Sequence, residues 1–189
     1  MRANWNERKA ILVSSTTLNR VKTPCIGVCS TGIGDSVCRG CKRFAHEVIR
    51  WNSYTEGEKR IVDARLNQFL AQIVGSKFRI VDLPKLRSGL ALQRVVYPAH
   101  KDPLLWVYEL LRAGASQIVR PEEYGLLLDA QYRDVPLAEL RTMIDSEFFI
   151  LSQAHYDRYF TREIVRDRGK ASNNEIAISD EVIMSATIK

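Results

Sequence analysis

The sequence lacks the features of a membrane protein and of a secreted one. No hydrophobic run reaches the roughly 18 residues that a membrane-spanning helix needs. Residues 1–22 contain no apolar stretch long enough for a signal peptide. We therefore expect a cytoplasmic protein. In that reducing compartment, clustered cysteines are more often metal ligands or redox groups than disulfides.

The familiar catalytic motifs are also missing. The chain has no G-x-S-x-G, no phosphate-binding Walker loop and no G-x-G-x-x-G. The polar side chains of the second half stand at no recognised catalytic spacing, and a role in solvation or helix capping is the preferred interpretation of each. These residues are His100, Asp102, Glu109, Asp145, Glu147 and His155. An enzymatic function is therefore not favoured, although the sequence leaves the question open.

Cysteine is scarce and confined to one place. The four cysteines follow the pattern C-x3-C-x8-C-x2-C, and they are Cys25, Cys29, Cys38 and Cys41. Glycines at positions 27, 32, 34 and 40 lie in the same stretch. Thiols so close in sequence can bind one centre, and four thiolates favour either Zn²⁺ or an iron–sulfur cluster. Because few apolar residues lie between them, the bound metal would replace a hydrophobic core.

The spacing leaves the metal open between zinc and an iron–sulfur cluster. A closed four-thiolate site is the commonest structural zinc site, which favours zinc. The first pair, however, is separated by three residues and not by the two usual for zinc. A glycine-rich backbone also offers the free amides that cluster sulfurs need as hydrogen-bond donors. His46 is a further candidate ligand, but a surface position on a helix is its preferred interpretation.

The net charge of +6 is unevenly placed. Residues 1–74 contain 12 Lys and Arg against 6 Asp and Glu, whereas residues 75–189 contain 16 of each kind. The positive excess thus accompanies the cysteines and suggests an anionic partner, either RNA or DNA or an acidic protein. The alternative is a solvated basic surface. The basic residues of this predicted surface are Arg39, Lys42, Arg43, Arg50, Lys59, Arg60 and Arg65.

Two aromatic residues lie beside these basic positions. Trp51 and Tyr54 have the ring faces on which unpaired bases stack. Core packing is nevertheless the preferred interpretation of Trp51, because a large indole is usually buried.

Hydrophobic periodicity predicts an α+β protein that is predominantly helical. A capping box of Thr55 and Glu58 opens a helix that should end at Gly75. Strands are expected where β-branched and aromatic residues concentrate, and proline marks the start of the later helices. The predicted helices are 42–51, 55–74, 102–114, 121–132 and a last one from Pro136 that continues toward Arg168, and the predicted strands are 78–82 and 90–97.

These elements group into four segments. We expect a flexible arm at 1–22, followed by a four-cysteine helical module at 23–75. A mixed domain with a short two-stranded element and three helices should occupy 76–168, and a tail should occupy 169–189.

Several short motifs carry a family resemblance. They are T-P-C-I-G-V-C at 23–29, V-C-R-G-C-K-R at 37–43, E-V-I-R-W at 47–51 and E-K-R at 58–60. Over about residues 23–70 the chain resembles the bacterial domain of unknown function 1289, whose members are commonly described as predicted Fe–S proteins. The resemblance implies metal bound by the four cysteines and implies no settled activity. Two functions therefore stay open: a metal-stabilised accessory or interaction protein, or an Fe–S protein that carries electrons or a cluster to a partner enzyme.

Overall fold

The computed structural model describes residues 20–161. Most of the predicted arm and all of the predicted tail lie outside the described residues, as does the expected end of the last helix near Arg168. The chain divides into two compact units, whose boundary in the described part lies between Ala64 and Arg65, inside one helix. The predicted domain limits stay a prediction.

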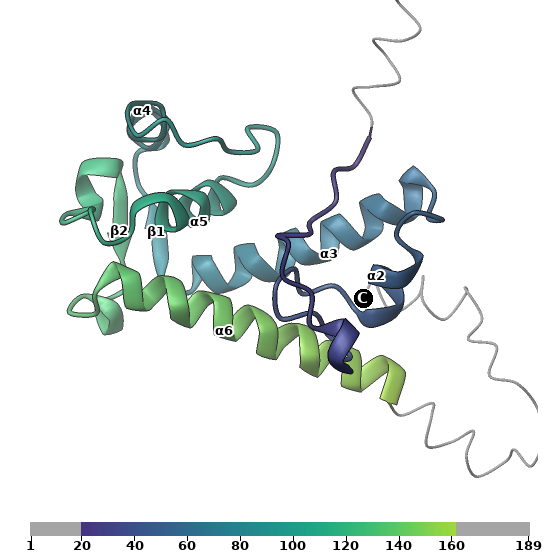
Figure 1. The fold of residues 1–189 in the computed structure, drawn as a ribbon. Coiled ribbons are helices and arrows are strands. Elements are labelled where there is room, and N and C mark those ends of the chain that lie inside the picture. Colours follow the sequence, from purple (N-terminus) through teal and green to yellow (C-terminus); the bar gives the residue numbers. More distant parts are fainter. Residues whose placement is uncertain (1–19, 162–189) are drawn as a thin grey trace, which may run out of the picture. The chain divides into compact units, whose positions relative to one another are not determined.

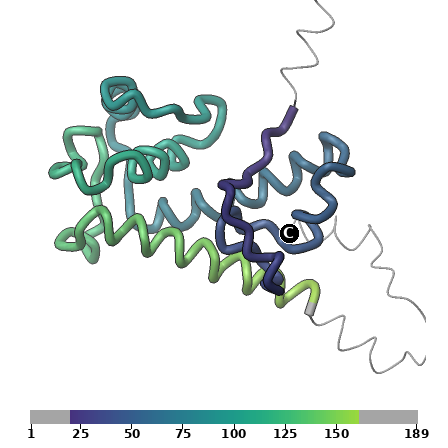
Figure 2. Tube along the Cα trace, in the orientation of Figure 1, coloured from purple at the N-terminus to yellow at the C-terminus, as the bar shows by residue number. Residues whose placement is uncertain are grey.

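The first unit is a long loop followed by helices. It contains the short 3₁₀ turn η1 (Thr31–Ile33), α2 (Ala45–Arg50) and the first turns of α3 (Glu56–Gly75), as Figure 1 shows. In Figure 2 the purple trace that precedes α2 is the segment that bears the cysteines. Among the described residues of this unit, 20–64, few apolar side chains are buried, and they are Val37, Phe44, Trp51 and Val62 with the thiols of Cys38 and Cys41. The core position predicted for Trp51 is confirmed.

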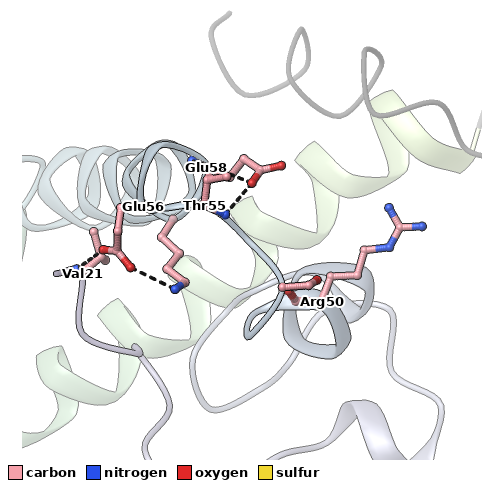
Figure 3. Close-up of polar contacts among 7 residues, drawn as sticks. Val21, Arg50, Thr55, Glu56 and Glu58 are labelled. Carbon is pink, nitrogen blue, oxygen red and sulfur yellow. Dashed lines mark hydrogen bonds and ion pairs between the residues drawn. The ribbon is translucent and has the colours of Figure 1, made fainter.

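The predicted capping box opens α3. The Thr55 amide donates to Glu58 Oε2 at 2.6 Å, and the Glu58 amide donates to Thr55 Oγ1 at 3.3 Å (Figure 3). These bonds satisfy amides that have no partner within the helix, which is why the helix begins here. One residue into the helix, Glu56 accepts a hydrogen bond from the Val21 amide at 2.7 Å and so attaches the incoming loop.

The second unit is built around a larger apolar core. After the end of α3 it contains β1 (Phe78–Ile80), α4 (Leu83–Leu92), α5 (Pro103–Gly114), η2 (Pro121–Tyr124), β2 (Leu126–Leu128), η3 (Ala130–Tyr132), α6 (Leu137–Tyr156) and a π-helical turn, η4 (Asp157–Thr161). The strands β1 and β2 pair antiparallel, with Phe78 opposite Leu128 (Figure 1). The helix α5 packs on α6 and on α4. The side chains buried most completely include Leu86, Leu90, Trp106, Leu110, Leu126, Leu140 and Ile144.

Two predicted elements are wrong in place or type. Residues 90–97, predicted as a strand, include the end of α4, because Leu86 and Leu90 lie one helical turn apart and both face the core. The strand that pairs with β1 is β2, inside the predicted helix 121–132. That helix is interrupted at Gly125, whose φ of 69° is left-handed.

The first predicted helix, 42–51, begins three residues late, at Ala45. The chain cannot be helical at Lys42, whose φ is 60°. The helices α3 and α5 are close to their predicted bounds, and the α+β class with predominant helix is confirmed. Among the described residues, none of the helices combines the length and the apolar character that a membrane crossing requires.

Candidate metal centre

The second cysteine pair lies in a tight hairpin, residues 37–44, which is closed by an antiparallel bridge between its end residues. The Cys38 amide donates to the Arg43 carbonyl at 2.8 Å, and the Lys42 amide donates to the Cys38 carbonyl at 2.8 Å. The left-handed Lys42 reverses the chain directly after Cys41. The hairpin thereby brings the thiols of Cys38 and Cys41 within hydrogen-bonding reach of each other.

Main-chain amides surround the Cys38 sulfur. The side chain is 1% exposed, and burial alone would raise the pKa of its thiol. Hydrogen bonds from the backbone of Cys41, Ser30 and Gly40 and from the Cys41 thiol outweigh that effect and lower the pKa to about 7. Amides that stabilise a thiolate are the same groups that stabilise a metal-bound sulfur.

The Cys41 sulfur has a side-chain donor. Arg43 Nε donates to Cys41 Sγ at 3.3 Å. Burial raises the pKa of the Cys41 thiol, and the nearby guanidinium of Arg43 only partly offsets that rise. Each sulfur of the hairpin pair thus has its own hydrogen-bond donors.

The first cysteine pair is exposed. Cys25 Sγ accepts a hydrogen bond from the Gly27 amide at 3.5 Å, and Cys29 Sγ lies 3.1 Å from Thr31 Oγ1. Gly27 has a φ of 88°, a conformation that side-chain-bearing residues seldom adopt. A Cβ at this position would meet no other atom within 4 Å.

The segment between the first two cysteines packs against the hairpin at Gly40. A Cβ on this residue would overlap the Val28 carbonyl oxygen and press on the Ile26 side chain. The Cys38 thiol lies 3.7 Å from that same carbonyl. One residue further along, the Arg39 amide donates to Ser30 Oγ at 2.9 Å. The two cysteine-bearing segments are therefore neighbours, and the absence of a side chain at residue 40 permits their approach.

Within residues 20–161, no three His, Cys, Asp or Glu side chains converge closely enough to hold a metal ion. The structure brings Cys38 and Cys41 together and leaves Cys25 and Cys29 exposed on the adjacent segment. The donor set nevertheless fits a soft metal, because a buried thiol pair with amide and guanidinium donors is half of a four-thiolate site. The other half would come from Cys25 and Cys29 on the adjacent segment.

Comparison with known families covers this same stretch. A family model described as protein of unknown function (DUF1289) matches residues 23–70. The predicted family resemblance is confirmed. No curated protein and no solved structure matches the chain. Residues 23–70, the DUF1289 segment, include all four cysteines, the hairpin and most of α3.

The basic residues of the DUF1289 segment divide into an exposed group and a buried group. Arg50 and Arg60 are exposed, and Figure 3 shows the Arg50 side chain extending away from α2. Arg39 is also exposed but pairs with Asp35 at 2.9 Å. Lys59 is half-buried and pairs with Glu56 at 3.0 Å.

The prediction that Lys42, Arg43 and Arg65 lie on the surface is wrong, because all three side chains are buried. They are 1%, 3% and 2% exposed. Lys42 turns inward because its Nζ donates to the carbonyls of Arg39 at 2.7 Å and Gly40 at 3.3 Å. The Arg43 guanidinium lies 4.7 Å above the centre of the Trp51 ring.

Ser30 is a site residue that sequence reasoning missed. It is buried, it accepts the Arg39 amide, and its backbone hydrogen-bonds the Cys38 sulfur. Its only signal in the sequence is its position directly after Cys29.

The polar residues considered for catalysis have structural partners. Asp102 caps α5 by accepting the Leu104 amide at 2.8 Å, as predicted. Glu147 pairs with the buried Lys77 at 2.6 Å. Glu109 pairs with Arg112, Asp145 accepts the Tyr108 hydroxyl, and the His155 ring contacts Phe69. His100 is exposed.

Proposed function

We propose that this chain is a cytoplasmic metal-binding accessory protein whose four cysteines hold one centre. The observation that carries the proposal is the approach of the two cysteine-bearing segments at Gly40, where the Val28 carbonyl occupies the space of a side chain. Two segments that each supply a cysteine pair, packed side by side, are what a single four-thiolate site needs.

The first unit gives a physical reason for a metal. Within its described residues, 20–64, few apolar side chains are buried, so hydrophobic burial there supplies little of the free energy that folding needs. A metal bound by thiolates ties the loop to the hairpin and contributes its binding energy to folding. In this role Cys38 and Cys41 form the inner half of the site, and Cys25 and Cys29 form the outer half.

The alternative is an Fe–S protein that passes electrons or a cluster to a partner enzyme. The exposure of Cys25 and Cys29 favours it, because a partner can then reach the centre from their side. The amide donors at Cys38 suit cluster ligands as well as zinc ligands.

Metal analysis of protein purified without oxygen, with its visible absorption spectrum, tests both functions. We expect one centre per chain, with binding lost when either Cys38 or Cys41 is replaced by serine. A colourless protein with stoichiometric zinc would exclude the Fe–S alternative. A wild-type chain that binds neither metal would refute the proposal as a whole.

A contact with an anionic partner through Arg39, Arg50, Lys59 and Arg60 is a second proposal. The observation in its favour is the exposure of Arg50 and Arg60 on successive helices, α2 and α3. We expect the full chain to bind RNA or DNA at low salt and to release it as salt rises, since phosphate contacts displace counterions.

The Arg50→Ala and Arg60→Ala double variant should weaken that binding, whereas Arg141→Ala, an exposed arginine on α6, serves as the control. Binding that is insensitive to salt, or equal losses in both variants, would count against this surface.

A further inference from the structure

We propose that Arg43 is the outer-sphere cation of the metal centre, a positioning residue that holds the Cys41 sulfur and offsets the charge of the bound thiolates. This inference rests on the proposed four-thiolate site. Its first support is the direct contact from Arg43 Nε to Cys41 Sγ at 3.3 Å. The guanidinium is 4.7 Å from the centre of the Trp51 ring, which limits its movement.

The second support is a donor without an acceptor. Arg43 Nη1 is buried and has no hydrogen-bond partner within the described part of the chain, although the residue is only 3% exposed. Leaving such a group unpaired is unfavourable, and more so when it carries charge. The negative charge of bound thiolates would stabilise this unpaired cationic donor, and the Nε of the same guanidinium already contacts the Cys41 sulfur.

The third support is the balance of buried charge. The buried charged side chains of residues 37–47 are Lys42, Arg43 and Glu47. Glu47 accepts the Phe44 amide at 2.9 Å, and the Lys42 ammonium has two carbonyl acceptors. These residues therefore include two buried cations and one buried carboxylate. A centre of four thiolates carries net negative charge and would compensate this excess of buried positive charge.

Replacing Arg43 should therefore weaken metal binding more than it weakens the fold. Outer-sphere partners of metal ligands typically change affinity about 10–100-fold when they are lost. We expect a loss in that range for Arg43→Gln, which keeps N–H donors but removes the charge. Arg43→Lys, which keeps the charge, should stay within about tenfold of the wild type.

Titration of the full chain with Co²⁺ alone, without oxygen, measures this effect. The absorption of a tetrahedral cobalt thiolate reports both the affinity and the electronic state of the sulfurs. Arg43→Gln should lower the affinity and shift the thiolate-to-cobalt absorption. Arg39→Gln is the matched control, because it removes a nearby arginine that is exposed and paired with Asp35, and it should do neither.

The outcomes separate the two proposals. A wild-type chain that shows no thiolate–cobalt absorption would overturn the metal site and Arg43 together. A wild type that binds Co²⁺ while Arg43→Gln binds it equally well, with unchanged absorption, would overturn the role of Arg43 alone. If circular dichroism shows that the Gln variant is unfolded, Arg43→Lys decides: affinity within tenfold supports the charge role, and a larger loss contradicts it.

Discussion

At the scale of the residue, Gly40 controls how closely the cysteine segments approach. Gly40→Ala places a methyl group on the Val28 carbonyl oxygen, which belongs to the backbone and cannot rotate away. We expect a loss of stability of about 1–3 kcal/mol and at least a tenfold weaker affinity for metal. Chelator competition and thermal unfolding measure the two effects.

Gly32→Ala is the control for that substitution, because a Cβ at residue 32 meets nothing within 4 Å. Gly32 lies in η1, between the two cysteine pairs. Similar losses of stability and metal affinity in both variants would show that any added methyl group in this stretch is harmful. Contact with the Val28 carbonyl would then not be the cause of the Gly40→Ala effect.

The buried ammonium of Lys42 is a second feature with a measurable consequence. Lys42→Met keeps a long unbranched side chain but leaves the carbonyls of Arg39 and Gly40 without their donor. Unpaired buried acceptors should lower the free energy of unfolding by about 1–3 kcal/mol. Lys59→Met, which breaks a partly exposed ion pair with Glu56, should cost less than about 1 kcal/mol. Equal losses in urea denaturation would contradict this account.

At this scale the sequence predicts ligand types better than side-chain orientation. Four thiols within one short stretch are recognised from the sequence as candidate ligands of one centre, and a glycine beside a cysteine suggests a tight turn. Lys42 and Arg43 were assigned to the surface because such side chains are almost never fully buried without partners. Their partners, two carbonyls and an aromatic ring, come together only through the left-handed turn at Lys42, and that turn leaves no pattern in the sequence.

At the scale of the element, Tyr108 links two helices of the second unit. Its hydroxyl, on α5, donates to Asp145 Oδ1 on α6 at 3.3 Å. Burial, with the negative charge of Asp145, raises the pKa of Tyr108 to about 12. In the unfolded chain the phenol ionises near its ordinary pKa of 10. The stabilising effect is therefore complete below pH 10 and is lost as the pH rises toward 12.

Tyr108→Phe tests that link. Near neutral pH the variant should lose about 0.5–1.5 kcal/mol, the contribution of one hydrogen bond. Above pH 10 the wild type should lose stability more steeply than the variant, so that the difference between them narrows. Urea denaturation from pH 8 to pH 11 measures it. A difference that stays constant over this range would contradict the raised pKa.

The elements that the sequence predicts well are those with local signals. The helix α3 has its capping box, and α5 has Asp102 and Pro103 at its start. The pairing of β1 with β2 has no such signal. Each strand has three residues, and Phe78 finds its partner Leu128 far along the chain. A strand this short is defined by its partner more than by its own residues, so a local pattern cannot place it.

At the scale of the whole molecule, the two units rely on different sources of stability. The second unit has an extensive apolar core, whereas the first has few buried apolar side chains and the four cysteines. Removing metal with a chelator should therefore lower the melting temperature of the first unit and leave that of the second nearly unchanged. Calorimetry should then show two unfolding transitions whose midpoints lie further apart than in the metal-bound protein. An equal shift of both would contradict separate stabilisation.

The unequal burial of the two cysteine pairs also sets an order of chemical attack. Cys38 has a lowered pKa, which favours its reactive thiolate, but its side chain is 1% exposed, whereas Cys25 and Cys29 are open to solvent. Access should outweigh ionisation, so an alkylating reagent added to metal-free protein should label the outer pair first. Mass spectrometry of samples taken at successive times would show the order in which the cysteines are labelled. Oxidative damage should follow the same order, so the outer pair is where oxidation would first disable the proposed metal centre.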